Sequence, residues 1–189
     1  MPNLNQLWTR CGALVFFAAL LPTMPVLAQV GRPAPTLVVP QSDGTTFDLK
    51  ALRGKVVIVD FWATWCKPCR EEIPVLSAFF KKYRDQGLEM IGVSIDGKRE
   101  ARDVPKIMSN AGYSWALMSR ASRSGFDMPD ELPDTFVIDD DGIVRAIFQG
   151  GKPPLTDEAL DKIMIPLLPD KLPTTSPTLS TVAASATGQ

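Results

Sequence analysis

The chain has 189 residues, of which 20 are Lys or Arg and 21 are Asp or Glu, and it contains no histidine. This length suits one domain with a sizeable core, and the small net charge of −1 favours neither nucleic acid nor an anionic membrane as a partner. Without an imidazole the chain cannot build a Ser-His-Asp or Cys-His hydrolase, a histidine-containing zinc site or a CxxCH haem attachment site.

The first 28 residues have the pattern of a secretory signal peptide. A polar start is followed by an apolar stretch, Cys11 to Leu21, and then by "VLA", which fits cleavage after Ala28. The alternative is an uncleaved anchor that holds the protein in the inner membrane facing the periplasm. Pro22 limits the apolar stretch to about 11 residues, well short of the ~20 that a spanning helix needs, so cleavage is favoured.

Cleavage would leave a single pair of cysteines, Cys66 and Cys69. An exported protein meets an oxidising compartment in which a disulfide persists. The loop that this pair would close contains only two further residues, so the disulfide would restrict the unfolded chain very little. We therefore expect its value to be chemical more than structural.

Hydrophobic patterning and turn residues predict one domain over residues 29–170, followed by a disordered tail over 171–189 that is rich in Ser, Thr, Pro and Ala. The expected elements are hairpin strands at 37–39 and 45–49, a buried strand at 55–62, a helix at 67–86 kinked at Pro74, a buried strand at 88–96, a helix at 99–111, a strand at 115–119, an irregular segment at 120–131, hairpin strands at 134–139 and 143–150, and a helix at 156–168 capped by Thr156.

This order of elements predicts an α/β fold around a mixed sheet, with parallel strands first and a hairpin last. The crossover rule brings the carboxyl ends of the parallel strands and the N-termini of the helices to one edge of the sheet. Cys66 lies between the strand at 55–62 and the helix at 67–86, so it is expected at that edge.

Thiol–disulfide exchange requires a thiolate, whereas a free cysteine is mostly protonated at neutral pH. The unpaired N–H groups at a helix start would stabilise a thiolate at Cys66. Lys67 and Arg70 add positive charge nearby, and Pro68 fits the first helical turn because its missing N–H is not needed there. Cys69, one turn into the helix and more covered, is expected to be the resolving thiol.

Two other uses of the cysteine pair are weighed against this one. Half of a zinc site would need two further ligands, and the mature chain offers neither a third cysteine nor a histidine, so carboxylates would have to serve. A purely structural disulfide is the other alternative. We expect no metal and no cofactor.

The segment "FWATWCKPC" resembles the active-site segment of the thioredoxin superfamily. With "GRPAP", "DLKALRGKVVIVDFWATWC" and "CREEIPVL", the chain is similar to the exported TlpA/ResA/CcmG-like branch over roughly Val30 to Leu168. The resemblance implies a thioredoxin fold, in which a central mixed β-sheet is flanked by helices, with a small N-terminal β-hairpin extension.

A carboxylate inside an apolar strand is costly to ionise, so the pKa of Asp60 is expected to rise. The resemblance implies that a buried acid accepts and returns the proton of the resolving cysteine. Asp60 matches the thioredoxin position of that acid, whereas the exported branch uses an acid six residues after the first cysteine, here Glu72. Asp60 is the favoured candidate. The alternatives are that Asp60 reaches water at the strand end and that Glu72 is an exposed helix residue beside Arg70.

The resemblance also implies a cis-proline opposite the disulfide, and "ELPDTFVID" places it at Pro133. The backbone of Leu132 would then be free to pair with an extended substrate segment, as in β-strand addition. Pro129 is the competing candidate, but it is not joined to a strand.

Three residues around the cysteines complete the expected substrate-binding surface. Trp65 is expected to form an apolar contact surface for the partner, whereas Trp62 is expected to belong at least partly to the core. Lys67 and Pro68, which lie between the cysteines, are expected to contact the substrate and to influence the reduction potential.

The resemblance implies a periplasmic thiol–disulfide oxidoreductase that reduces disulfides of partner proteins and is re-reduced by a membrane electron donor. A narrower function within this class is to prepare the cysteines of apocytochrome c for haem attachment. The segment "PDTF" suggests it, because it is similar to the "PETF" of the cytochrome-maturation members. We expect a monomer that binds no nucleic acid.

Two rival functions come from other classes. A peroxidase of the peroxiredoxin kind would place its nucleophile in a PxxxTxxC pattern, which "DFWATWC" lacks. A copper-delivery or assembly factor could hold Cu(I) with the two thiolates alone, although copper sites of related folds add a histidine. Metal retained after purification would favour the second rival, and turnover of a disulfide substrate would count against it.

Overall fold

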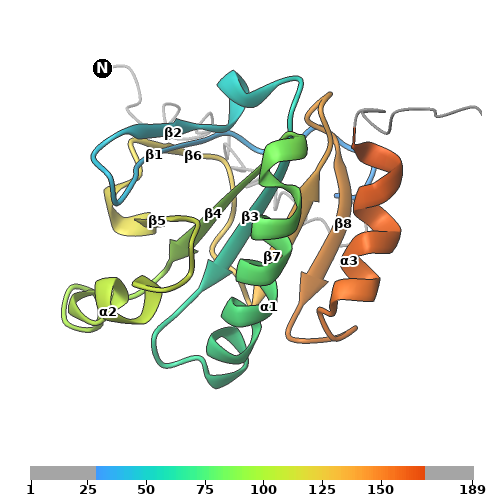
Figure 1. Cartoon of the computed structure of the whole chain (residues 1–189). Helices are drawn as coiled ribbons and strands as arrows, with labels where there is room; N and C mark the ends of the chain where they lie inside the picture. The colour runs from blue at the N-terminus through green and yellow to red at the C-terminus, as the bar shows by residue number, and fades with distance from the viewer. Residues whose placement is uncertain (1–28, 169–189) are drawn as a thin grey trace, which may run out of the picture.

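The structure is a computed structural model, and it describes residues 29–168 (Figure 1). The expected signal segment at 1–28 and the expected tail at 171–189 lie outside the described residues. Among the helices described between residues 29 and 168, none is long and apolar enough to cross a membrane.

A five-stranded mixed sheet forms the centre of the domain, with the strand order β5-β4-β3-β7-β8. Strands β3 and β4 are parallel, as are β4 and β5, whereas β3 with β7 and β7 with β8 are antiparallel. The antiparallel pair β7 and β8 is the hairpin that the sequence predicts. The strands are β3 (Val56–Trp62), β4 (Leu88–Ser94), β5 (Ser114–Leu117), β7 (Asp134–Ile138) and β8 (Val144–Gln149).

Three α-helices pack on one face of this sheet; in Figure 1, α1 crosses in front of it and α3 stands beside β8. The longest, α1, carries Pro74 inside it, and it ends in a short 3₁₀ turn before Gly87, whose φ of 97° stops the helix. Thr156 caps α3 by accepting a hydrogen bond from the Ala159 N–H, as predicted. The helices are α1 (Lys67–Tyr83), α2 (Val104–Met108) and α3 (Asp157–Met164), with 3₁₀ turns at Leu49–Leu52, Arg84–Gln86, Glu100–Arg102, Met118–Arg120 and Ile165–Leu167.

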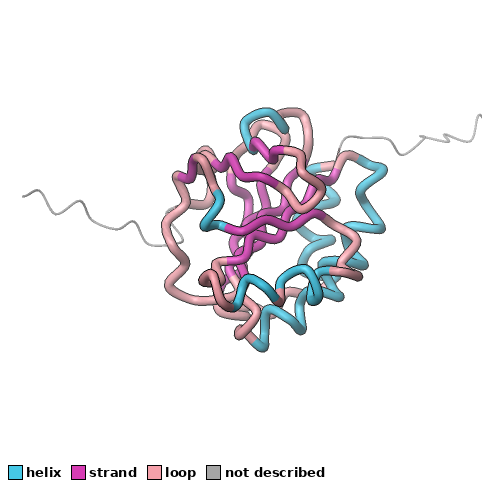
Figure 2. The backbone as a smooth tube through the Cα atoms, turned by 90° about the vertical axis from the view of Figure 1, so that its left-hand side faces the viewer, coloured by secondary structure: helices cyan, strands magenta, loops and turns pink. Residues whose placement is uncertain are grey.

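The opposite face of the sheet is covered by a second, three-stranded antiparallel sheet with the order β2-β1-β6. Its strands are β1 (Leu37–Pro40), β2 (Thr46–Asp48) and β6 (Arg123–Ser124). The smoothed trace in Figure 2 shows the strands gathered in the middle of the domain, with most of the helical segments to the right of them and below. The expected N-terminal hairpin is therefore present, but it gains a third strand from a segment that the sequence predicted to be irregular.

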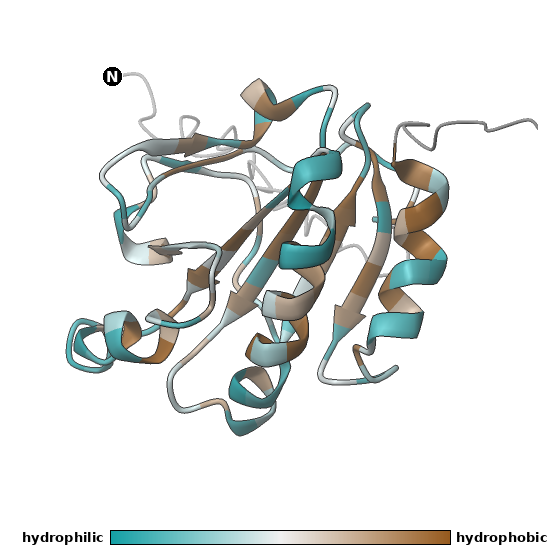
Figure 3. Cartoon of the chain, in the orientation of Figure 1, coloured by the Kyte–Doolittle hydropathy of each residue, from teal (hydrophilic) through white to brown (hydrophobic). Residues whose placement is uncertain are grey.

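Alternation along β3 separates two hydrophobic cores. Val56, Ile58 and Trp62 face the core that the helices cover, while Val57 and Phe61 face the core under the small sheet. All seven residues of β3 are buried, as expected for a strand covered on both faces. In Figure 3 the central strands are mostly in the hydrophobic colour, and α1 and α3 show hydrophilic segments between hydrophobic ones.

The same alternation decides where the acid in β3 points. Asp60 lies two residues from both Ile58 and Trp62, so it is on the face covered by the helices. That face carries the start of α1. The strand pattern alone therefore directs a carboxylate into the interior beneath the helix that holds both cysteines.

The confirmed part of the fold prediction is the mixed sheet flanked by helices. The helix expected at 99–111 is shorter than predicted: only Val104–Met108 is α-helical, preceded by the 3₁₀ turn Glu100–Arg102. Its apolar residues still contribute to the core, because Val104 and Met108 are buried.

Candidate active site

The two cysteines lie where β3 gives way to α1. Cys66 occupies the N-cap position of α1 and Cys69 lies in its first turn, and a disulfide joins them with their Cα atoms 5.3 Å apart. The Cys69 N–H donates a hydrogen bond to the Cys66 Sγ over 3.2 Å. Both residues are buried as whole residues and belong to the core on the helix side of the sheet.

This location favours the thiolate form of Cys66 once the disulfide is reduced. The first N–H groups of a helix have no partner inside it, and they carry about half a positive charge. Pro68 lies in this first turn, where its missing N–H costs nothing. Lys67 adds less free charge than expected because its ammonium group pairs with Glu71, one turn further along α1.

Asp60 lies within β3 and is 2% exposed, so the prediction of a buried carboxylate is confirmed. Burial raises the pKa of Asp60 to about 7; a hydrogen bond from Thr135 partly offsets this, and the nearby charge of Glu72 adds to it. Thr135 stands opposite Asp60 on β7, and its hydroxyl donates to Asp60 Oδ1 over 2.9 Å. The carboxyl group therefore changes its charge near neutral pH.

Glu72 lies on α1 and is only partly exposed, so the alternative of a fully exposed helix residue is wrong. Burial raises the pKa of Glu72 to about 7. Its Oε2 atom is buried and has no hydrogen-bond partner among the described residues. Because its charge acts on Asp60, the two candidate acids form one interacting pair.

A third acid, Asp134, interacts with Asp60, although the sequence analysis used this residue of "PDTF" only as an indication of the partner. It directly follows Pro133 and is buried, and its Oδ1 has no hydrogen-bond partner in the described part of the chain. Burial raises the pKa of Asp134 to about 7, and the charges of Asp60 and Asp130 add to the shift. Its position next to Pro133 was the available signal.

Two aromatic side chains complete the polar interior. Trp62 Nε1 and the Tyr113 hydroxyl are both buried without a hydrogen-bond partner among residues 29–168. They meet over Gly92, where an added Cβ would lie 3.3 Å from Trp62 Nε1 and 3.3 Å from the Tyr113 ring. Burial raises the pKa of Tyr113 well above its usual value, and the charges of Asp60 and Glu72 raise it further.

The other expected site residues differ in their exposure. Trp65 is 63% exposed, whereas Trp62 is fully buried, as the two different expectations for these tryptophans require. Pro68 is exposed. The Leu132–Pro133 peptide bond is cis, and the partly buried Leu132 side chain packs against the core that contains both cysteines.

A hydrogen-bonded clamp that the sequence did not reveal fixes the segment before Cys66. Asp96, just after β4, is 3% exposed, and its carboxylate accepts hydrogen bonds from the Thr64 N–H and the Thr64 hydroxyl. The Ser94 hydroxyl donates to the same carboxylate over 2.8 Å. Because Thr64 precedes Trp65 and Cys66, the clamp fixes the approach to the nucleophile.

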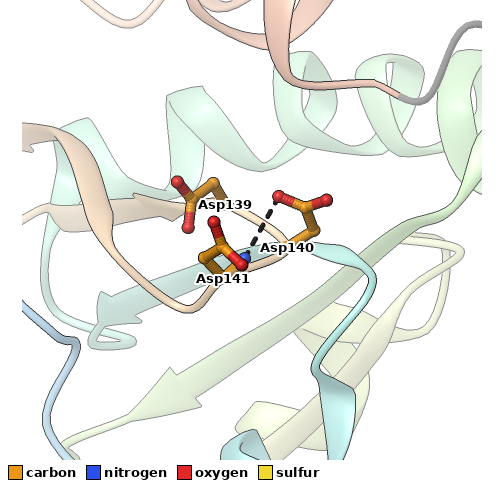
Figure 4. A group of neighbouring side chains, drawn as sticks. All are labelled: Asp139, Asp140 and Asp141. Carbon is orange, nitrogen blue, oxygen red and sulfur yellow. Dashed lines mark hydrogen bonds between the residues drawn. The ribbon is translucent and has the colours of Figure 1, made fainter.

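Three neighbouring carboxylates in the described part of the chain lie close enough together to share a metal ion. They are Asp139, Asp140 and Asp141, in the turn between β7 and β8 (Figure 4). Asp139 already accepts hydrogen bonds from the Ile143 N–H and from the Arg145 side chain. These contacts explain the burial of Asp139 as part of the turn, without a metal ion.

Comparison with known proteins gives consistent matches. Residues 30–147 match the family model of the AhpC/TSA family. A thiol-disulfide oxidoreductase ResA of Bacillus anthracis is 35% identical over 118 residues, covering 61% of this chain and 67% of the relative. ResA of Bacillus subtilis (strain 168) is 32% identical over 122 residues, covering 64% and 67%. The crystal structure of a thiol:disulfide interchange protein of the thioredoxin family from Chlorobium tepidum TLS superimposes with a TM-score of 0.58 at 28% identity, covering 72% of this chain and 96% of that one.

Proposed function

The chain belongs to the AhpC/TSA family and is a thiol-disulfide oxidoreductase with a thioredoxin-like fold, and from this premise we propose that it reduces disulfides of partner proteins in the periplasm. The observation that carries the proposal is the placing of the Cys66–Cys69 pair at the start of α1, on the face of the sheet that also carries Asp60, a buried acid whose pKa is about 7. Such a pair can form a thiolate, and the acid can exchange a proton at the pH of the compartment.

The reaction proceeds in two exchange steps. The Cys66 thiolate attacks one sulfur of the partner disulfide; a bond forms between Cys66 Sγ and that sulfur, and the other partner sulfur leaves as a thiolate. Cys69 then loses its proton and attacks Cys66 Sγ, which closes the Cys66–Cys69 disulfide and releases the second partner thiolate. Two electrons pass from the dithiol to the partner, and the protein is oxidised.

In the second step a buried acid acts first as proton acceptor and then as proton donor. The carboxylate of Asp60, or of Glu72 next to it, accepts the proton of Cys69 and returns it to the released thiolate. Trp65, Lys67 and Pro68 contact the partner around the nucleophile. Leu132 and Pro133 offer it a backbone edge on the other side of the disulfide.

Export and re-reduction complete the proposed cycle. The signal segment would deliver the domain to the periplasm, where a membrane electron donor restores the dithiol. Apocytochrome c is the narrower partner, suggested by the acidic Asp134 after Pro133.

The reduction potential tests the direction of electron flow. We would equilibrate the purified protein with a thiol redox buffer and measure the oxidised fraction of the Cys66–Cys69 pair. A potential near or below about −220 mV, in the range of thioredoxins and glutaredoxins, is expected for a reductant. A potential near about −120 mV, like that of a strong oxidant, would contradict the proposal.

A trapping experiment tests the roles of the two thiols. With Cys69→Ser, the Cys66 thiolate should attack a partner disulfide and stop at a stable mixed disulfide, detected as a covalent adduct by mass. Cys66→Ser is the matched control and should form no adduct through Cys69, because Cys69 is the more buried of the two. Adduct formation through Cys69 alone would reverse the assignment.

A further inference from the structure

A hollow of about 500 Å³ lies beside the segment of the chain that carries the disulfide. Its lining is formed by the residues that flank the cysteines in sequence together with residues at and just before α2. The lining residues are Thr64, Trp65, Arg70, Asp103, Lys106 and Ile107. Trp65 precedes Cys66 and Arg70 follows Cys69, so this surface offers contacts to the residues that flank the disulfide of a bound partner.

One wall of the hollow is held in place. The Asp96 carboxylate accepts two hydrogen bonds from Thr64, and Asp96 itself is fixed by Ser94 at the end of β4. Trp65 follows Thr64 and is 63% exposed, so it presents a large apolar surface on a fixed segment. A surface ordered in advance costs little conformational entropy on binding.

The charges in the hollow are mainly positive. Arg70 and Lys106 line it, and neither takes part in an ion pair within the described residues, whereas the neighbouring Lys67 is paired with Glu71. Asp103 contributes one carboxylate to the same lining. A guanidinium group binds a carboxylate through two parallel hydrogen bonds, and an ammonium group adds a point charge.

We propose that this hollow binds a segment of the disulfide-bearing partner that carries a carboxylate side chain beside the reacting cysteine. The backbone of that segment lies over Trp65, and its carboxylate lies between Arg70 and Lys106. This inference rests on the proposed reduction of partner disulfides and names a feature of the partner that the cysteine chemistry alone does not select. Electrostatic complementarity of this kind acts mainly on association and on the choice of partner.

Matched peptide disulfides test the proposal. Three peptides would differ only in the residue next to the cysteine, which is Glu, Gln or Lys, and kcat/KM for reduction would be measured with the full protein. The Glu peptide is expected to be reduced about tenfold faster than the Lys peptide, and raised salt should narrow the ratio. A substitution that changes the intrinsic reactivity of Cys66 alters kcat/KM for all three peptides by the same factor. The ratio of kcat/KM between two peptides is therefore independent of that reactivity.

Substitutions of Arg70 and Lys106 test whether these two residues cause the preference for the Glu peptide. Arg70→Gln and Lys106→Gln are each expected to lower the Glu-to-Lys ratio about threefold, and Lys106→Glu should shift the preference toward the Lys peptide. Lys162→Gln, which removes an exposed cation from α3 outside the hollow, is the control and should leave the ratio unchanged.

The two kinds of failure are distinguishable. Equal rates for the three peptides, or a ratio that survives in both Gln variants, would overturn the docking proposal while the Gln peptide still demonstrates disulfide reduction. Failure to reduce any of the three peptides would overturn the proposed function and the docking proposal together.

Discussion

The carboxylates in the interior of this molecule form two groups, which differ in the number of hydrogen bonds that each carboxylate accepts. Asp96 and Asp139, which follow β4 and β7, each accept hydrogen bonds from two other residues and hold a loop or a turn in place. Asp60 and Glu72 lie on the helix side of the main sheet, and Asp134 stands opposite Phe61 at the start of β7. Asp60 accepts one hydrogen bond, and the other two acids keep a buried oxygen without a partner in the described residues.

The difference separates a structural role from a chemical one. A carboxylate that accepts several hydrogen bonds holds its donors in place. A buried carboxylate with few donors is nearly as stable when protonated, which places its pKa in the range where protons are exchanged. Asp96 positions the active-site segment and Asp139 holds the turn between β7 and β8, whereas the second group supplies the acid.

The largest expected effect is a loss of stability on substitution of Asp96, one of the carboxylates that hold a loop in place. Asp96→Ala removes hydrogen bonds from Thr64 and Ser94 and leaves their buried donors unpaired, so the free energy of unfolding should fall by about 3 kcal/mol. Chemical denaturation at constant pH would measure it. Asp103→Ala is the control, because Asp103 is exposed and caps no helix through its side chain, and its effect should stay within about 0.5 kcal/mol. Equal effects of the two substitutions would remove the structural role assigned to Asp96.

The next largest effect is on the rate of the second exchange step and follows from substitution of Asp60. Asp60→Asn replaces the proton-accepting carboxylate of β3 with an amide that cannot take up the Cys69 proton, so the rate of the second exchange step at pH 7 should fall about 100-fold. Stopped-flow fluorescence of the tryptophans would follow the step between pH 5 and 9. Thr135→Val is the matched variant: it removes the hydrogen bond that lowers the pKa of Asp60, so the midpoint of the pH profile should rise. If Glu72→Gln lost the rate and Asp60→Asn kept it, Glu72 would be the proton acceptor.

A smaller change, counted per pH unit, is expected in the free energy of unfolding as the pH rises. The pKa of Asp60 is about 7 in the folded protein, against an ordinary value of 3.8, so between these pH values the folded state holds a proton that the unfolded chain has released. Stability should therefore be highest below pH ~4 for this group and fall by about 1.4 kcal/mol per pH unit until the pH reaches about 7. Urea unfolding of the oxidised protein at several pH values would show the slope, and Asp60→Asn should reduce it. A free energy of unfolding that stays constant from pH 4 to 7 would contradict the titration of Asp60.

Features carried by neighbouring residues in the chain could be predicted from the sequence. The buried strand, the helix with its proline, the cysteine pair and Asp60 all lie within Val56–Tyr83 and depend on local patterns. Strand β6 could not be predicted because Arg123 and Ser124 are polar and exposed, and only their pairing with β1 makes them a strand.

The missed site residues depend on contacts between distant segments. Asp96 is separated from Thr64 by 32 residues, and nothing in "VSID" indicates which donors will face its carboxylate. Asp134 resembles any polar strand start, and its burial arises because β7 lies between β3 and β8. Sequence patterns indicate which side chains enter the interior of a single strand, whereas the pairing of buried polar groups requires the assembled sheet.

The smallest expected effect tests whether Asp134 titrates together with Asp60 and Glu72. Like charges raise each other's pKa, and the charge of Asp60 raises that of Asp134, so the two groups titrate together. Asp134→Asn removes one negative charge while keeping the size of the side chain, and it should move the midpoint of the exchange profile to lower pH by up to about one unit. Asp130→Asn, which removes an exposed charge from the segment just before β7, should move the midpoint less. An unchanged midpoint in Asp134→Asn would place Asp134 outside the proton-exchanging group, and a mixed-disulfide yield that falls without any shift would assign it to partner contact instead.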